Sequence, residues 1–175
     1  MILNLFRKTP SHEVVYAVYR AIVAQSRQPV FYADWGVPDT VTGRFDMISL
    51  HMSLVFHRLR GAGGSAAEFG QALFDLFFKD MDRSLREMGA GDLAVPKKVR
   101  KMTEVFYALM TGVNEAIERG DKAGVEAVLR RNVLGETDGA HAGELASYLI
   151  AQHAALMAQP VEAILEGKLD MAVAA

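Results

Sequence analysis

The side chains of this sequence best suited to bind a metal or to move a proton are its histidines. There are five: His12, His51, His57, His141 and His153. His51 and His57 are six residues apart, so on one helix they would point to different sides. There is no His-Glu-x-x-His motif, no Glu-x-x-His pair of the kind that holds iron in helical bundles, and no cysteine. We therefore predict no metal site and no cofactor, with the histidines hydrogen-bonded or exposed to solvent.

Acidic side chains crowd one stretch of the chain, where Asp75, Asp80, Asp82 and Glu87 alternate with basic residues. A catalytic pair of carboxylates should converge on a substrate from different elements. These four fall on one predicted helix, where Asp82 and Arg86 are placed for an ion pair. The sequence also offers no nucleophile with an oriented base. The pattern predicts a salt-bridged or partner-binding face and a protein that is not an enzyme.

Basic side chains gather at the start of another predicted helix, at Lys97, Lys98, Arg100 and Lys101. Positive charges near a helix N-terminus are unfavourable, by roughly 0.3–1 kcal/mol each. Two interpretations stay open. One is a solvated face that tolerates this cost, and the other is a patch for an acidic partner, a ribosomal surface or lipid head groups. The net charge of the chain is −2, so no general basic field recruits nucleic acid.

The elements that must position these residues are helices, because apolar residues recur at helical spacing and no segment of strand length alternates. Ser11 can cap the first helix, which should end before Pro29 because residues that precede proline avoid the helical region. Gly36 and Pro38 break regular structure, so residues 31–39 are predicted to form an ordered loop. The predicted helices cover about residues 11–28, 40–60, 65–88, 96–119, 121–131, 140–157 and 160–165.

The composition is sufficient for one sizeable core, since half of the 175 residues are hydrophobic and under a quarter are charged. The helix predicted over 40–60 carries two apolar stripes, which predicts burial on more than one side. We expect an all-α fold, a single-domain bundle of six to seven helices. Residues 1–10 would form an N-terminal tail and residues 11–175 the helical domain.

Contact with a membrane is expected to be peripheral at most. No apolar run reaches the roughly 18 residues that a membrane-spanning helix needs, and the expected location is cytoplasmic, with at most peripheral contact at the inner membrane. The N-terminus is either a frayed end, a segment laid on the domain, or a weak membrane contact. The last interpretation would use four apolar and two basic side chains: Ile2, Leu3, Leu5, Phe6, Arg7 and Lys8.

The segment from 31 to 39 is rich in aromatic residues, which include Tyr32 and Trp35. Such residues dominate binding hot spots, but they also commonly fix a loop onto its own core. The chemistry of the residues leaves both interpretations open.

Three blocks of this sequence, in order and spacing, resemble the ubiquinol–cytochrome c chaperone family. They are FYADWGVPDT at 31–40, GRFDM at 43–47 and FFKDMDRSLREMG at 77–89, followed by Gly-Asp at 91–92 and Val-Pro-Lys at 95–97. The resemblance is sharpest over residues 31–120. Because no long N-terminal extension precedes the blocks, the chain is similar to the compact bacterial form of the family.

The resemblance implies a chaperone that binds newly made cytochrome b, a membrane-protein client, during assembly of respiratory complex III. It also implies a small co-chaperone and the ribosome as further partners. We expect a client groove beside the second and third predicted helices, and the nine methionines would help it adapt to an irregular apolar client. The candidate partner-binding residues are Tyr32, Trp35, Phe45, Phe77, Phe78, Asp80, Met81, Asp82, Arg86 and Glu87. The alternative is a helical bundle that binds a hydrophobic ligand such as a quinone, a lipid or haem.

Overall fold

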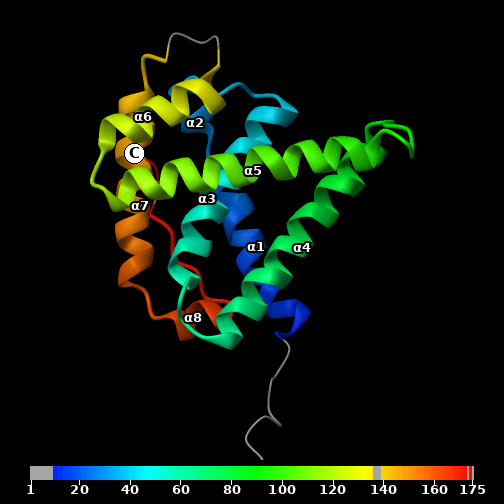
Figure 1. Ribbon diagram of the computed structural model, residues 1–175, viewed down its shortest axis with the longest axis horizontal. Helices are drawn as coiled ribbons and strands as arrows, with labels where there is room; N and C mark the ends of the chain where they lie inside the picture. Colours follow the sequence, from blue (N-terminus) through cyan, green and yellow to red (C-terminus); the bar gives the residue numbers. More distant parts are fainter. Residues whose placement is uncertain (1–9, 136–138, 173, 175) are drawn as a thin grey trace, which may run out of the picture.

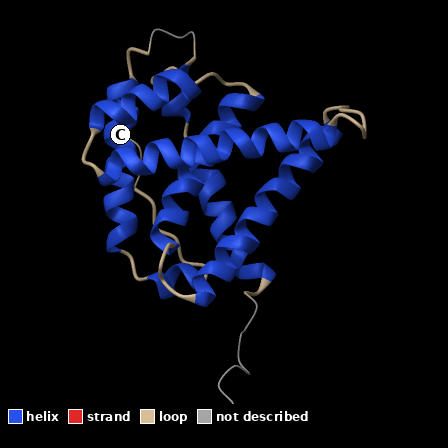
Figure 2. Cartoon of the chain, in the orientation of Figure 1, coloured by secondary structure: helices blue, strands red, loops and turns tan. Residues whose placement is uncertain are grey.

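The computed structural model of the chain describes residues 10–135, 139–172 and 174, and all regular structure within them is helical (Figure 2). The elements are α1 (His12–Ser26), α2 (Pro29–Ala33), α3 (Val41–Leu59), α4 (Gly64–Glu87), α5 (Val95–Glu118), α6 (Lys122–Leu129), the π-helical turn η1 (Arg130–Leu134), α7 (Ala142–Ala158) and α8 (Val161–Leu165). The all-α prediction is confirmed. The interpretations of the N-terminus concern residues 1–9, which lie outside the described residues.

Local side-chain chemistry explains where several helices begin and end. Ser11, Thr40 and Asp121 each accept a hydrogen bond from the backbone N–H three residues later, which caps α1, α3 and α6. At the other end of α4, Gly89 takes a positive φ of 84°. There the N–H of Ala90 bonds back to the carbonyl of Leu85, as in a glycine-terminated helix.

Two helical segments were not predicted. Residues 31–33 belong to α2 rather than to a loop, because Pro29 opens a helix at its first turn as well as ending the previous one. The predicted loop over 132–139 begins later than expected, since η1 continues the helical path of α6 to Leu134. The seven predicted helices correspond to α1 and α3–α8.

The centre of the fold is α3, which contacts α1, α4, α5 and α7. Every residue from Phe45 to Val55 is buried, so the predicted burial of this helix on more than one side is confirmed. The two longest helices, α4 and α5, meet at the turn formed by residues 88–94 and diverge from it as the arms of a V (Figure 1). Within the described residues, no helix is both long enough and apolar enough to span a bilayer.

A buried polar network ties α3 to α1 and α7. His51 Nδ1 lies 2.7 Å from the carbonyl oxygen of Met47, and Nε2 lies 2.8 Å from the hydroxyl of Tyr148. Because a carbonyl only accepts, Nδ1 carries the proton and Nε2 accepts from the tyrosine. Gln25 Nε2 donates to the same hydroxyl at 2.6 Å. Burial lowers the pKa of His51 to about 4, so the ring is neutral and completes the network.

A second buried polar group on α3 lacks such partners. Asp46 is 2% exposed, and within the described residues its Oδ1 has no hydrogen-bond partner. One turn further along, the hydroxyl of Ser49 is also buried without a partner in the described structure. Burial raises the pKa of Asp46 to about 7. The carboxyl group is therefore protonated in the folded chain at mildly acidic pH.

Candidate functional site

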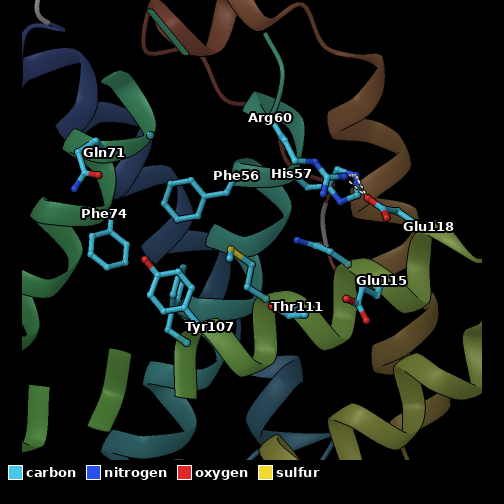
Figure 3. A pocket seen from close by; sticks show the side chains of 13 residues that line it. Phe56, His57, Arg60, Gln71, Phe74, Tyr107, Thr111, Glu115 and Glu118 are labelled. Atoms are coloured by element: carbon cyan, nitrogen blue, oxygen red, sulfur yellow. Dashed lines mark hydrogen bonds and ion pairs between the residues drawn. The ribbon is translucent and has the colours of Figure 1, made fainter. Parts of the chain in front are cut away.

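A cleft of about 390 Å³ lies between α3, α4 and α5, inside the V formed by the two long helices (Figure 3). Its position follows from the divergence of α4 and α5, which leaves the end of α3 as the floor between them. The lining residues are Phe56, His57 and Arg60 from α3, Gly70, Gln71 and Phe74 from α4, and Phe106, Tyr107, Met110, Thr111, Asn114, Glu115 and Glu118 from α5.

One end of the cleft is a wall of aromatic rings. The ring of Phe106 is buried and meets the rings of Phe56 and Phe74 edge-on, at centroid distances of 5.9 and 5.8 Å. Phe56 and Phe74 are only half-buried, and Tyr107 is 48% exposed. Figure 3 shows the rings of Phe56, Phe74 and Tyr107 side by side along the cleft. Phe56 and Phe74 pack partly on the core, but the apolar surface that they and Tyr107 leave exposed in the cleft is suited to contact another molecule.

A glycine keeps this wall open. A Cβ at Gly70 would lie 3.6 Å from the ring of Phe56, an ordinary van der Waals distance. An alanine would therefore fit, although a glycine inside a helix is less stable than alanine by about 1 kcal/mol. Packing does not require the glycine, but a longer side chain at this position would cover the Phe56 ring.

The other end of the cleft is charged. Arg60 forms an ion pair with Glu118, and His57 Nε2 lies 3.3 Å from the same carboxylate (Figure 3). The Arg60 guanidinium holds the pKa of Glu118 below its usual value. Behind this group the ring of His153 on α7 packs on His57 at 4.6 Å. Burial, and then the charge of His57, lower the pKa of His153.

These features give the cleft an apolar end and a charged end that another molecule could contact. Among the described lining residues, neither Tyr107 nor Thr111 is hydrogen-bonded to a histidine or a carboxylate, which is the pairing that activates a hydroxyl nucleophile. The described residues also contain no group of three or more histidine or carboxylate side chains placed to hold a metal ion. An apolar segment that ends in polar groups matches both ends of the cleft.

Comparison with known proteins identifies the family. The family model for the ubiquinol–cytochrome c chaperone matches residues 33–172. The chain belongs to this family. A crystal structure of the Cbp3 homolog from Brucella abortus is similar at 37% identity, over 98% of this chain and 97% of that one, with a TM-score of 0.86.

Curated relatives of this chaperone family are similar over a shorter stretch. The ubiquinol–cytochrome c reductase complex assembly factor 1 of Xenopus laevis is 26% identical over 117 residues, which are 67% of this chain and 58% of the frog protein. The human and mouse proteins of that name are 26% and 25% identical over 114 residues, 65% of this chain and 38% of theirs. The matched region is thus about half, or less, of each of these relatives.

The aromatic loop of the family-like first block packs on its own core. The ring of Trp35 meets those of Phe31 and Tyr148 edge-on, at 5.5 and 5.8 Å, and Trp35 is only 9% exposed. The hydroxyl of Tyr32 donates to the carbonyl of Ser26 at 2.8 Å. These contacts hold the aromatic segment on the core, while Tyr32 on α2 keeps a partly exposed ring. Binding of a partner by Tyr32 or Trp35 stays a prediction.

The apolar members of the predicted groove are also buried. The rings of Phe45 and Phe77 stack at 5.5 Å, with 3% and 0% exposure. Phe78 and Met81 are nearly as buried. Of these four, Phe78 lies nearest to the cleft, since its ring packs on Phe74 at 4.6 Å. None of these four side chains lines the cleft, although the rings of Phe77 and Phe78 pack against its lining residue Phe106.

The charged members of the predicted partner-binding set, Asp80, Asp82, Arg86 and Glu87, lie on α4. Asp80 accepts a hydrogen bond from the hydroxyl of Tyr19 at 2.8 Å, which fixes α4 to α1. Asp82 and Arg86 form the predicted ion pair, with Nε and Oδ2 2.6 Å apart. Glu87 is exposed at the end of the helix. Only these last three are available to a partner, and they lie toward the α4–α5 turn, away from the cleft.

The sequence did not single out the residues that line the cleft. Phe56, Phe74 and Met110 all belonged to apolar stripes that were assigned to the core. The available signal was the excess of apolar faces on the second and third predicted helices. These correspond to α3 and α4, which both contribute residues to the cleft. This signal could not indicate which stripe stays open, because that depends on the angle between α4 and α5.

Proposed function

We propose that this chain is an assembly factor for respiratory complex III, which binds newly made cytochrome b through the cleft between α3, α4 and α5. The family and the names of the relatives support the assignment to assembly of complex III. The observation that carries the site is the wall of half-exposed aromatic rings, bordered by charges, inside the V. The proposed place of action is the cytoplasm beside the inner membrane, where such a client is inserted.

The size of the cleft limits how the client would bind. About 390 Å³ holds a few side chains, not a whole membrane-spanning helix. We therefore propose that two or three apolar side chains of a client segment enter between Phe56, Phe74 and Tyr107. The thioether of Met110 would adapt to their shape. Such anchoring by a few residues is the usual way in which binding energy is concentrated at an interface.

The charged end would define the position of the client segment. A membrane segment ends in polar residues at the bilayer surface, and Arg60, Glu115 and Glu118 could contact those residues. Of the predicted partner-binding set, the exposed Asp82, Arg86 and Glu87 remain proposed contacts, for example for a small co-chaperone or for the ribosome.

Photo-crosslinking during synthesis of the client tests the cleft directly. A photoreactive phenylalanine analogue replaces Tyr107, and in a control it replaces Tyr16, a tyrosine of similar exposure on α1. We expect adducts with nascent cytochrome b from position 107 and none from position 16. Adducts from position 16 alone, or from neither position in a chain that still supports complex III, would contradict the proposal.

A steric block provides a second test. Gly70→Leu should fill the cleft beside Phe56 and abolish the crosslink from position 107. Ala67→Leu, at an exposed position one turn earlier on α4, should leave it intact. Native mass spectrometry of the purified chain tests the alternative function, a helical bundle that binds a hydrophobic ligand. A quinone, lipid or haem that leaves on Gly70→Leu, without any cytochrome b adduct, would favour a ligand-binding bundle.

A further inference from the structure

The turn between α4 and α5 exposes apolar side chains that the fold does not use. Leu93 is 89% exposed and Met88 is 54% exposed. In Figure 1 this turn is the point of the V, and it extends beyond the other helices. Exposed leucines cost a folded chain solubility and contribute nothing to its core. At the most protruding end, Leu93 and Met88 are accessible to a surface outside the molecule.

The turn that presents these side chains is well held. Leu85 in the last turn of α4 and Val95 in the first turn of α5 are both buried at this end. The N–H of Val95 bonds to the carbonyl of Gly91 at 3.1 Å. Arg86 forms an ion pair with Asp92 across the turn. Leu93 therefore points outward from an ordered scaffold.

Next to the apolar pair, the first two turns of α5 carry four exposed cations: Lys97, Lys98, Arg100 and Lys101. Arg100 and Lys101 lie 3.4 and 3.7 Å from Glu104. Within the described residues, Lys97 and Lys98 have no carboxylate within 4.0 Å. Between residues 92 and 101 the only carboxylate is Asp92. Cations at a helix N-terminus destabilise the helix, so the fold explains neither the charges nor the exposed leucine.

We propose that the α4–α5 turn docks on an anionic phospholipid surface. Leu93 and Met88 would enter the interfacial layer, and the four cations would contact the head groups. Apolar side chains at the tip, with basic side chains on long stems behind them, are the arrangement that interfacial membrane contacts use. A protein partner would need a wider complementary face than one turn offers. Docking of the α4–α5 turn on the membrane would not depend on the presence of the client.

Docking at this turn would bring the cleft close to the bilayer. Tyr107 lies ten residues beyond Lys97 on the same helix, which is a rise of about 15 Å. An apolar client segment that leaves the membrane could reach the cleft over that distance without crossing much water.

Vesicle flotation of the full chain tests the proposal, with phosphatidylcholine vesicles that contain or lack phosphatidylglycerol. We expect binding only when the anionic lipid is present. Each cation near an anionic surface contributes roughly a fivefold gain in partitioning, so Lys97→Gln with Lys98→Gln should weaken binding about 25-fold. Leu93→Ser should weaken it about tenfold. Circular dichroism confirms that the variants are folded.

Matched controls carry the same chemical change elsewhere. Arg119→Gln with Lys122→Gln removes two charges from exposed positions near the other end of α5, and Met157→Ser removes an exposed apolar side chain of α7. Both should bind vesicles as the unchanged chain does. No binding to anionic vesicles, or equal losses in the control pair, would overturn the proposal.

Two further outcomes would also overturn it. One is vesicle binding that persists in the turn variants and is lost on Arg7→Gln with Lys8→Gln, which would assign the contact to the N-terminal segment. The other is unchanged vesicle binding with loss of ribosome co-sedimentation, which would make the turn a ribosome contact. Neither experiment requires cytochrome b, so failure here leaves the crosslinking test of the cleft untouched.

Discussion

Replacing Asp46 by asparagine should stabilise the folded chain above neutral pH. The carboxyl group is 2% exposed, and its Oδ1 has no hydrogen-bond partner within the described residues. Burial raises its pKa from 3.8 to about 7. Each unit of pKa difference between the folded and unfolded chain corresponds to about 1.4 kcal/mol, so the ionised form destabilises the fold by up to about 4 kcal/mol.

The sign of the pH dependence follows from proton binding. Between about pH 4 and pH 7 the folded chain holds a proton on Asp46 that the unfolded chain has lost. The contribution of this group to stability therefore falls as the pH rises through that window, and the full penalty persists above it. Asparagine cannot ionise, but it buries an amide that also lacks a complete set of partners. The expected net gain is about 2 kcal/mol near pH 8 and close to zero near pH 4.

Urea unfolding of the two chains near pH 5 and near pH 8 measures this difference. Asp34→Asn is the matched control, since Asp34 is exposed and its replacement changes the net charge by the same amount. We expect the stability difference for Asp46→Asn to grow with pH and that for Asp34→Asn to stay near zero. If Asp46→Asn changes the free energy of unfolding by the same amount at both pH values, the assignment of a desolvated carboxyl group at Asp46 is refuted.

Three further substitutions test the scaffold and the cleft by urea unfolding. Gly43→Ala should destabilise the chain by about 2–3 kcal/mol, because its Cβ would lie 2.0 Å from a backbone carbonyl oxygen. Gly91→Ala is the control, since Gly91 lies in open space, and it should not change stability. An equal loss of stability in both variants would contradict this prediction. Tyr148→Phe should cost about 1–3 kcal/mol, since His51 Nε2 loses its hydrogen bond, and a neutral result would mean that water replaces the hydroxyl. Gly70→Ala should stabilise α4 by up to about 1 kcal/mol and retain the client crosslink, whereas a loss of stability would indicate that the cleft is tighter than described.

The helices were predictable because their boundaries depend on neighbouring residues. Thr40 and Asp121 cap the helices they precede, and a cap needs only the backbone N–H three residues later. The short helix α2 was missed because Pro29 is compatible with two local structures, the end of one helix and the start of another. The choice between them is made by packing, since Phe31 is fully buried.

The candidate site was less predictable because its geometry depends on residues far apart in the chain. Trp35 is held by Tyr148, more than a hundred residues later, and no local pattern indicates that contact. Likewise, Phe56, Phe74 and Tyr107 form one wall only because three helices diverge at a particular angle. Aromatic residues serve cores and interfaces equally well, so their type alone could not assign them.

The resemblance and the cleft report on different parts of the molecule. The blocks at 31–40 and 43–47 contain the buried Trp35 and Asp46. They also contain Gly43, where a side chain would clash with the carbonyl oxygen of Pro38. These positions are constrained by packing, so their pattern identifies the fold. Phe74 and Tyr107, which face the cleft, lie outside all of the blocks. Residues constrained by packing therefore contribute to the first two blocks, while the third block also includes the exposed Arg86 and Glu87. The residues proposed to hold the client lie outside every block, and only the angle between α4 and α5 brings them together.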